Sequence, residues 1–157
     1  MNRISALFAQ ATEPVLNVYT TAGFPRFEDT MTVLTALQTG GVDIIEIGMP
    51  YSDPVADGET IQQSNQAALE QGMSVAHLFT QLTDMRKTIT VPVLLMGYIN
   101  PVLQYGVEAF CAKCAAIGID GLILPDLPMA EYEREYNKAH GERVKQGARG
   151  LVWRATY

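Results

Sequence analysis

The amino-acid sequence predicts an α/β protein built on a parallel β-sheet. Short runs rich in Val, Ile and Leu alternate with segments of helical periodicity along the chain. The runs are nearly continuous in apolar residues, as expected for strands of a parallel sheet. No G-x-G-x-x-G follows the first run, so the pattern favours a (β/α)8 barrel over a doubly wound dinucleotide-binding sheet. With 157 residues, 48% of them hydrophobic, the chain is expected to form one globular domain.

The N-terminal part of the chain predicts a helix, a strand, a second helix and a second strand. Ile4, Leu7 and Phe8 have helical spacing, and we expect this helix to pack over the N-terminal end of the strands. The second helix is expected to end at Gly40 and Gly41, because glycine commonly terminates helices. The expected ranges are a strand at 15–20 closed by the turn TAGFP, a helix at 28–39 and a strand at 42–48.

The remaining chain continues the alternation of helices and strands. Gly72 separates two amphipathic segments, and Ser74 is a candidate N-cap for the second of them. The segment GYINP is expected to form the turn that closes the third strand. The expected ranges are helices at 60–70 and 74–88, a strand at 91–96, a helix at 107–117, a strand at 120–124 closed by PDLP, and a helix from 129 to about 136.

Composition and charge exclude several classes of function. A formal net charge of −6 and a pI near 4.8 leave no dense basic surface for nucleic acid or an anionic membrane. The apolar part of the N-terminus is too short for a signal peptide. No run approaches the roughly 18 apolar residues of a membrane helix, and we therefore expect a cytoplasmic protein.

Neither the cysteines nor the histidines form a motif for metal or redox chemistry. Cys111 and Cys114 form a C-x-x-C pair, but no second pair of Cys or His accompanies it. Both cysteines fall at helical spacing with apolar neighbours, and we interpret them as buried side chains of a helix. His77 and His140 lack a partner motif, so we assign them packing or surface roles. No metal site is predicted.

Glu46 is the candidate catalytic residue. It lies inside the apolar run at 42–48, two residues before the end of that run. In a (β/α)8 barrel, functional side chains lie at the C-terminal ends of the strands. A partly desolvated carboxylate in this position can donate and accept protons near neutral pH. Asp53 and Asp57 follow in a loop rich in Pro and Gly, and they can approach the same ligand.

Three other interpretations of these acidic residues remain open. Glu46 could be held in an ion pair. The aspartates could serve only as turn formers, since Asp-Pro and Asp-Gly favour turns. Carboxylate oxygens also suit a magnesium ion, although no further residue of the sequence supports one.

Four segments of the sequence resemble the tryptophan synthase α chain family. They are NVYTTAGFP, EIGMPYSDPVADGETIQ, LLMGYINPVLQYG and GLILPDLP, and their order and spacing match over roughly residues 1–136. The resemblance implies a (β/α)8 barrel lyase that cleaves indole-3-glycerol phosphate to indole and glyceraldehyde 3-phosphate in tryptophan biosynthesis. It also implies a β chain as the partner in an α2β2 assembly. No cofactor is implied for this reaction, because the pyridoxal phosphate belongs to the β chain.

The same resemblance implies roles for individual residues. Glu46 matches the catalytic glutamate that protonates the indole ring carbon and helps to deprotonate the glycerol hydroxyl. Asp57 matches the loop aspartate that accepts a hydrogen bond from the indole N–H and stabilises the cationic intermediate. Tyr19 and Tyr98 match positions that line the indole pocket. The positions that match the side facing the β chain are Pro50, Asp53, Asn100, Pro101 and Asp126.

The resemblance stops near residue 136. A complete barrel takes about 250 residues, so the four recognisable strands predict an incomplete barrel. Residues 1–136 hold six basic and 16 acidic residues, whereas residues 137–157 hold five basic and one acidic. We expect this second segment to be a basic tail unlike the family, either disordered or continuing the last helix.

The incomplete barrel has a consequence for activity. In the family, the phosphate of the substrate is bound by the second half of the barrel, so the chain alone is expected to have weak or no activity. The alternative function is a non-catalytic fragment that self-associates or binds the β chain. A different phosphate-handling barrel enzyme is a third interpretation, and the motif around Glu46 and Asp57 argues against it.

Overall fold

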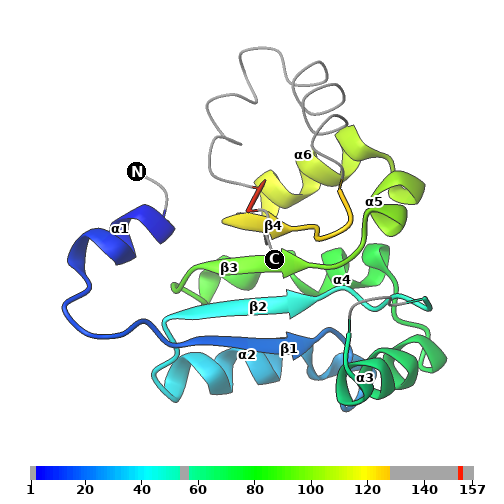
Figure 1. The fold of residues 1–157 in the computed structure, drawn as a ribbon, viewed down its shortest axis with the longest axis horizontal. Helices are drawn as coiled ribbons and strands as arrows, with labels where there is room; N and C mark the ends of the chain where they lie inside the picture. Colours follow the sequence, from blue (N-terminus) through cyan, green and yellow to red (C-terminus); the bar gives the residue numbers. More distant parts are fainter. Residues whose placement is uncertain (1–2, 54–56, 128–151, 154–157) are drawn as a thin grey trace.

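The computed structural model describes residues 3–53, 57–127 and 152–153 of the 157-residue chain. These residues form a sheet of five parallel strands whose order in the sheet is their order in the sequence (Figure 1). A doubly wound sheet reverses its direction of winding, whereas this sheet winds in one direction, as a barrel does. The predicted class is confirmed as an α/β structure corresponding to part of a (β/α)8 barrel. The strands are β1 (Asn17–Thr21), β2 (Ile44–Gly48), β3 (Val93–Met96), β4 (Gly121–Ile123) and β5 (Val152–Trp153).

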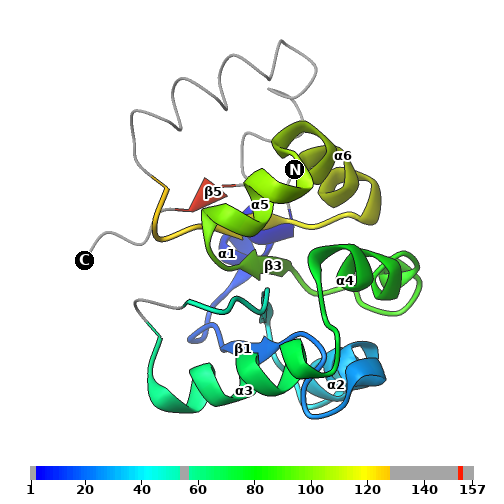
Figure 2. The same cartoon turned by 90° about the vertical axis from the view of Figure 1, so that its right-hand side faces the viewer.

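Helices connect β1 to β2, β2 to β3 and β3 to β4. Figure 2 looks at the C-terminal ends of the strands and shows α2, α4 and α6 on the same side of the sheet. The predicted N-cap of α4 is confirmed, because Ser74 Oγ accepts a hydrogen bond from the backbone N–H of His77 at 3.3 Å. The helices are α1 (Arg3–Gln10), α2 (Thr30–Thr39), α3 (Glu59–Glu70), α4 (Val75–Gln81), α5 (Ile99–Tyr105) and α6 (Val107–Ile117), with short 3-10 helices η1 (Phe27–Asp29) and η2 (Met85–Lys87).

The main core lies between the sheet and these helices. Successive residues of a strand point to opposite faces, and Ile45 and Ile47 of β2 point to the helical side, where both are fully buried. They belong to a cluster that includes Leu34 of α2, Phe79 of α4 and Phe110 of α6. Burying each such side chain stabilises the fold by about 1.5–3 kcal/mol.

A second, smaller cluster lies on the opposite face of the sheet. Ile44 of β2 and Leu94 of β3 pack there with Ile4 of α1. Figure 1 shows α1 beside the N-terminal ends of the strands, where the sequence predicted it. Glu46 follows Ile44 by two positions in β2, so both side chains point to this face of the sheet. Glu46 lies nearer than Ile44 to the C-terminal edge of the sheet.

An ion cluster fixes the N-terminal edge of the sheet. Asp120, which is 6% exposed, accepts hydrogen bonds from Arg86 Nη2, from Arg3 Nη1 at 2.9 Å and from the backbone N–H of Val93 at 2.9 Å. Burial lowers the pKa of Arg86 below its ordinary value, although the nearby Asp120 carboxylate favours the charged form. The cluster therefore joins α1, η2, β3 and the residue that precedes β4.

Several elements differ from the sequence prediction. The segment after β3 was expected to be only a turn, yet it contains α5; Pro101 lies in the first helical turn, where its missing N–H disrupts no helical hydrogen bond. The helix expected at 74–88 ends at Gln81 and is followed by η2. Strand β5 was not predicted. The helix expected at 129–136 lies outside the described residues.

Candidate active site

Glu46 and Tyr19 lie side by side at the C-terminal half of the sheet. Tyr19 of β1 and Glu46 of β2 are direct partners in the strand register, so their side chains point to the same face. The Nδ2 group of Asn17, two residues before Tyr19, donates a hydrogen bond of 2.5 Å to Glu46 Oε1. The half-buried Glu46 carboxylate is thereby held by an amide donor. Glu46 forms no ion pair within the described residues.

Tyr19 lies close to both predicted catalytic carboxylates, because it is the register partner of Glu46 and lines a small cavity together with Asp57. Burial raises the pKa of the Tyr19 phenol above its ordinary value, and the negative charges of Asp57 and Glu46 act in the same direction. The Tyr19 hydroxyl lies 3.5 Å from Thr21 Oγ1. Thr21 Oγ1 is in turn 2.7 Å from Ser64 Oγ of α3, so a polar contact joins β1 to α3.

Gly48, at the end of β2, makes room for the Tyr19 ring. A Cβ built on Gly48 would overlap the Tyr19 hydroxyl. We therefore expect Gly48→Ala to displace Tyr19 and to lower the free energy of unfolding by about 1–3 kcal/mol, measured by urea denaturation. Gly58→Ala is the control for steric overlap, because a Cβ there meets nothing within 4 Å, and any small loss it shows reflects its N-cap position in α3. Equal stability of the two variants would contradict this account of Gly48.

A small cavity lies at this edge of the sheet. Its volume is about 40 Å³. Asp57 and Asn65 provide its carboxylate and its amide, and Tyr19 and Tyr98 its aromatic rings. Partial burial raises the pKa of the Asp57 carboxyl above its ordinary value. The complete lining is Tyr19, Met49, Asp57, Asn65, Met96, Gly97, Tyr98 and Pro125, so Glu46 lies beside the cavity and not in its wall.

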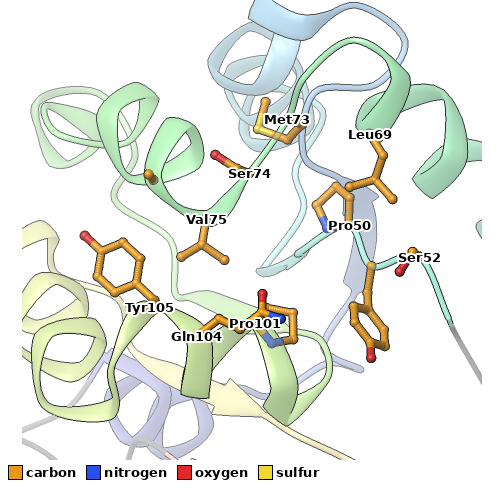
Figure 3. Close-up of a pocket in the computed structure, with 11 residues that line it drawn as sticks. Pro50, Ser52, Leu69, Met73, Ser74, Val75, Pro101, Gln104 and Tyr105 are labelled. Atoms are coloured by element: carbon orange, nitrogen blue, oxygen red, sulfur yellow. The ribbon is translucent and has the colours of Figure 1, made fainter.

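Two of the residues predicted to face a partner lie at a separate groove of about 400 Å³ (Figure 3). Pro50 and Pro101 line this groove, and Figure 3 shows Val75 across from Pro101. The other predicted residues lie close to it or support it: Asn100 donates to the Tyr51 hydroxyl at 2.9 Å, Asp53 is exposed and accepts from Ser52 Oγ at 2.7 Å, and Asp126 accepts from the backbone N–H of Ile99 at 3.0 Å.

Tyr51 and Tyr98 form a wall between the groove and the small cavity. Tyr51 lines the groove and Tyr98 lines the small cavity. Their ring centroids are 5.3 Å apart, with the planes tilted by 34°. Such offset aromatic pairs pack favourably. The groove and the cavity are therefore separated by two rings in contact.

The cysteines and histidines, which could bind a metal or take part in redox chemistry, do not form a second site in the described part of the chain. Cys114 is buried on α6, as predicted, whereas Cys111 is only half-buried, and burial raises the pKa of both thiols. His77 packs edge-on against Phe27 with a centroid distance of 5.4 Å, and His140 lies outside the described residues. No group of three or more His, Cys, Asp or Glu able to hold a metal occurs among the described residues. No helix in this part of the chain could span a membrane.

The fold and the site define a class of protein. A parallel sheet that winds in one direction and gathers carboxylates at the C-terminal ends of its strands is characteristic of (β/α)8 barrel enzymes. Comparison with known proteins identifies the family. A family model described as tryptophan synthase alpha chain matches residues 6–146. The chain belongs to the tryptophan synthase alpha chain family.

Individual relatives show how much of the family this chain covers. A tryptophan synthase alpha chain from Flavobacterium johnsoniae is 53% identical over 136 residues, which are 87% of this chain and 53% of that one. The structure of tryptophan synthase subunit alpha from Legionella pneumophila matches with a TM-score of 0.81 and 34% identity, over 99% of this chain and 68% of that one. A tryptophan synthase complex from Pyrococcus furiosus matches with a TM-score of 0.74 and 35% identity, over 89% of this chain and 55% of that one.

The chain spans about half the length of the curated relatives it matches. The family match ends at residue 146, beyond the boundary expected near 136. Residues 128–151 are outside the described residues. Apart from strand β5 at Val152–Trp153, the expectation that the segment at 137–157 is disordered or continues the last helix therefore stays a prediction.

Proposed function

We propose that the chain supplies the carboxylate half of an active site that cleaves indole-3-glycerol phosphate to indole and glyceraldehyde 3-phosphate. The observation that carries this proposal is that Tyr19 is the register partner of Glu46 and also lines a small cavity together with Asp57. Membership of the tryptophan synthase alpha chain family supports the same reaction. The protein would then act in tryptophan biosynthesis as a cytoplasmic lyase.

The proposed chemistry requires one proton to be delivered and one to be removed. Glu46 gives a proton to the ring carbon that carries the glycerol chain, which makes the indole ring cationic. The bond from this carbon to the chain then breaks, and its electrons return to the ring. The adjacent chain hydroxyl loses its proton to a base and becomes the aldehyde carbonyl. A glutamate carboxylate fixed by Asn17 can perform both proton transfers.

Asp57 has a complementary role in this proposal. Its carboxylate accepts the ring N–H and stabilises the positive charge that develops on the ring. Tyr19 and Tyr98 pack against the ring, since both line the small cavity beside Asp57. All atoms of this reaction are handled by side chains and substrate, so the proposal needs no cofactor.

A β chain is the proposed partner. The groove lined by Pro50 and Pro101 provides a concave surface next to the small cavity, and the wall of Tyr51 and Tyr98 separates the two. Asp53, Asn100 and Asp126 lie around the same surface or support it. A Pyrococcus furiosus relative is a tryptophan synthase complex, which favours this assignment. Pyridoxal phosphate would belong to the β chain.

The proposed function is tested by indole release from indole-3-glycerol phosphate. The purified chain is assayed alone, with a β chain, and with a complementing fragment. This fragment is the part of the Flavobacterium johnsoniae alpha chain that lies outside the matched region. We expect indole and glyceraldehyde 3-phosphate in equal amounts once the fragment is added, because eight strands complete the barrel. A stable complex of the chain with the fragment that releases no indole would contradict the proposal.

Asn17 offers a test of how Glu46 is held. Asn17→Ala removes the amide that donates to Glu46 Oε1. We expect kcat for indole release to fall by about tenfold to a hundredfold, because small misplacements of a catalytic group reduce the rate by such factors. KM should change little. In a Glu46→Gln background the same substitution should have no further effect, and additive losses would show that Asn17 acts independently of Glu46.

Asp57→Asn should separate activity from stability. Partial burial raises the pKa of Asp57 above its ordinary 3.8, so folding favours the protonated form. The stability associated with this group is fully present below pH 3.8 and falls as the pH rises through the folded-state pKa. At pH 7 the free energy of unfolding of Asp57→Asn should equal or exceed that of wild type, while activity falls about 10²-fold. Parallel urea titrations at low and neutral pH check the sign.

A further inference from the structure

Asn65 is a buried amide that the proposed chemistry does not use. It lies on α3 and is 3% exposed. Its Oδ1 atom is buried and accepts no hydrogen bond. Asn65 also lines the small cavity together with Asp57, Tyr19 and Tyr98. A residue that lines the candidate active site therefore carries a buried acceptor without a donor.

A buried oxygen of this kind destabilises a protein that has no ligand. Water would satisfy it in the unfolded chain, and that hydrogen bond is lost on folding. Apolar side chains such as leucine would fill the same space without this loss. An unpaired polar group at the wall of a cavity is explained when a ligand supplies the missing partner.

Gln81 provides a contrast within the same protein. Its Oε1 atom is also buried without a partner. However, Gln81 Nε2 donates a hydrogen bond of 2.7 Å to the backbone oxygen of Phe27 and so connects α4 to η1. Gln81 does not line the small cavity. Gln81 therefore has a structural role of its own. The Asn65 side chain differs, because it forms no hydrogen bond within the described residues.

We propose that the Asn65 amide oxygen accepts a hydrogen bond from a donor group of the bound ligand, as a second acceptor beside Asp57. The inference rests on the proposed function. Indole-3-glycerol phosphate offers a ring N–H and the hydroxyls of its glycerol chain as donors. The apolar and aromatic side chains of the cavity wall, Met49, Met96, Tyr98 and Pro125, are chemically complementary to an aromatic ring, and the cavity of about 40 Å³ must widen to admit an indole. Two acceptors in such a cavity fit a flat ligand that carries more than one donor.

The test uses Asn65→Leu, which keeps the branched shape of the side chain at a somewhat larger volume and removes the acceptor. Because the substitution removes an unsatisfied polar group, the melting temperature of the free protein should stay the same or rise. Affinity is measured by NMR titration for indole and for benzothiophene, which has a similar shape but no N–H. It is also measured for indole-3-glycerol phosphate, in a Glu46→Gln background that prevents turnover. Gln81→Leu is the control, with ligand affinities expected to stay at the wild-type level.

The three ligands identify the donor. If Asn65 accepts the ring N–H, the preference of wild type for indole over benzothiophene disappears in Asn65→Leu. If it accepts a chain hydroxyl, only the affinity for indole-3-glycerol phosphate falls. In both cases the affinity of the ligand that loses its hydrogen bond should fall by about tenfold. Unchanged affinities together with a lower melting temperature would overturn the proposal, because Asn65 would then be structural. Wild-type protein that binds none of the ligands would overturn it as well.

The same measurements separate this inference from the proposed function. Wild-type protein that binds the ligands through Asn65 but releases no indole even in a stable complex with the complementing fragment would leave the Asn65 assignment intact and refute the lyase. Indole release that is insensitive to Asn65→Leu, with unchanged affinities, would refute the Asn65 assignment alone.

Discussion

Replacing Glu46 with glutamine is expected to lower the rate of indole release by about 10²–10⁴-fold, the range contributed by a general acid–base group. Glutamine keeps the shape and the side-chain oxygen that accepts from Asn17, but it can neither donate nor accept the proton at the ring carbon. The free energy of unfolding should therefore change little. The rate is measured with all components of the assay that supports wild-type turnover.

Glu108→Gln is the matched control for this prediction. Glu108 is exposed in the first turn of α6, away from the carboxylate site. It should retain wild-type turnover and stability. Wild-type rates in Glu46→Gln would remove Glu46 from the chemistry, and unfolding of Glu46→Gln would show that the carboxylate is structural.

Replacing Asp120 with alanine is expected to be the most destabilising single change outside the main core. The carboxylate accepts from Arg86, Arg3 and the Val93 N–H, and its side chain is 5% exposed while that of Arg86 is 17% exposed. Removing it leaves the guanidinium of Arg86 buried without its counterion. Breaking a buried pair in this way costs about 3–5 kcal/mol, a large part of the stability of a small domain.

Asp84→Ala is the control for this second prediction. Asp84 pairs with Lys87 at 2.9 Å, but the two side chains are 71% and 74% exposed. An exposed pair contributes about 1 kcal/mol or less. Urea denaturation should therefore place Asp84→Ala close to wild type and Asp120→Ala far below it. Similar stabilities for the two variants would contradict the role given to the ion cluster.

Most of the fold could be predicted because each strand and helix leaves a pattern of apolar residues within its own short segment of the sequence. The alternation of apolar runs with helical segments located four strands, and the helix at 107–117 was predicted with the bounds that α6 has. The helix α5 was missed because GYINP contains a proline that is typical of turns but is also tolerated in a first helical turn.

The candidate site was predictable only in part. A glutamate in an apolar run is visible in the sequence, as is a loop aspartate, and family motifs support both. Asn17 and Asn65 were missed because their importance depends on contacts across strands and with a cavity. Asn17 precedes Glu46 by 29 positions, and only the register of β1 and β2 brings the two side chains together. The same holds for Gly48, whose small size matters because Tyr19 lies over it.

An NMR titration of the isotopically labelled chain with indole shows directly whether the C-terminal edge of the sheet binds a ligand. The largest chemical-shift changes are expected at Tyr19, Asp57, Asn65 and Tyr98, with small changes in the groove that contains Pro50 and Pro101. Saturation at these positions would establish that the C-terminal edge of the sheet is the ligand site. Changes confined to the groove or to the opposite edge near Asp120, with none around Tyr19 and Asp57, would contradict it.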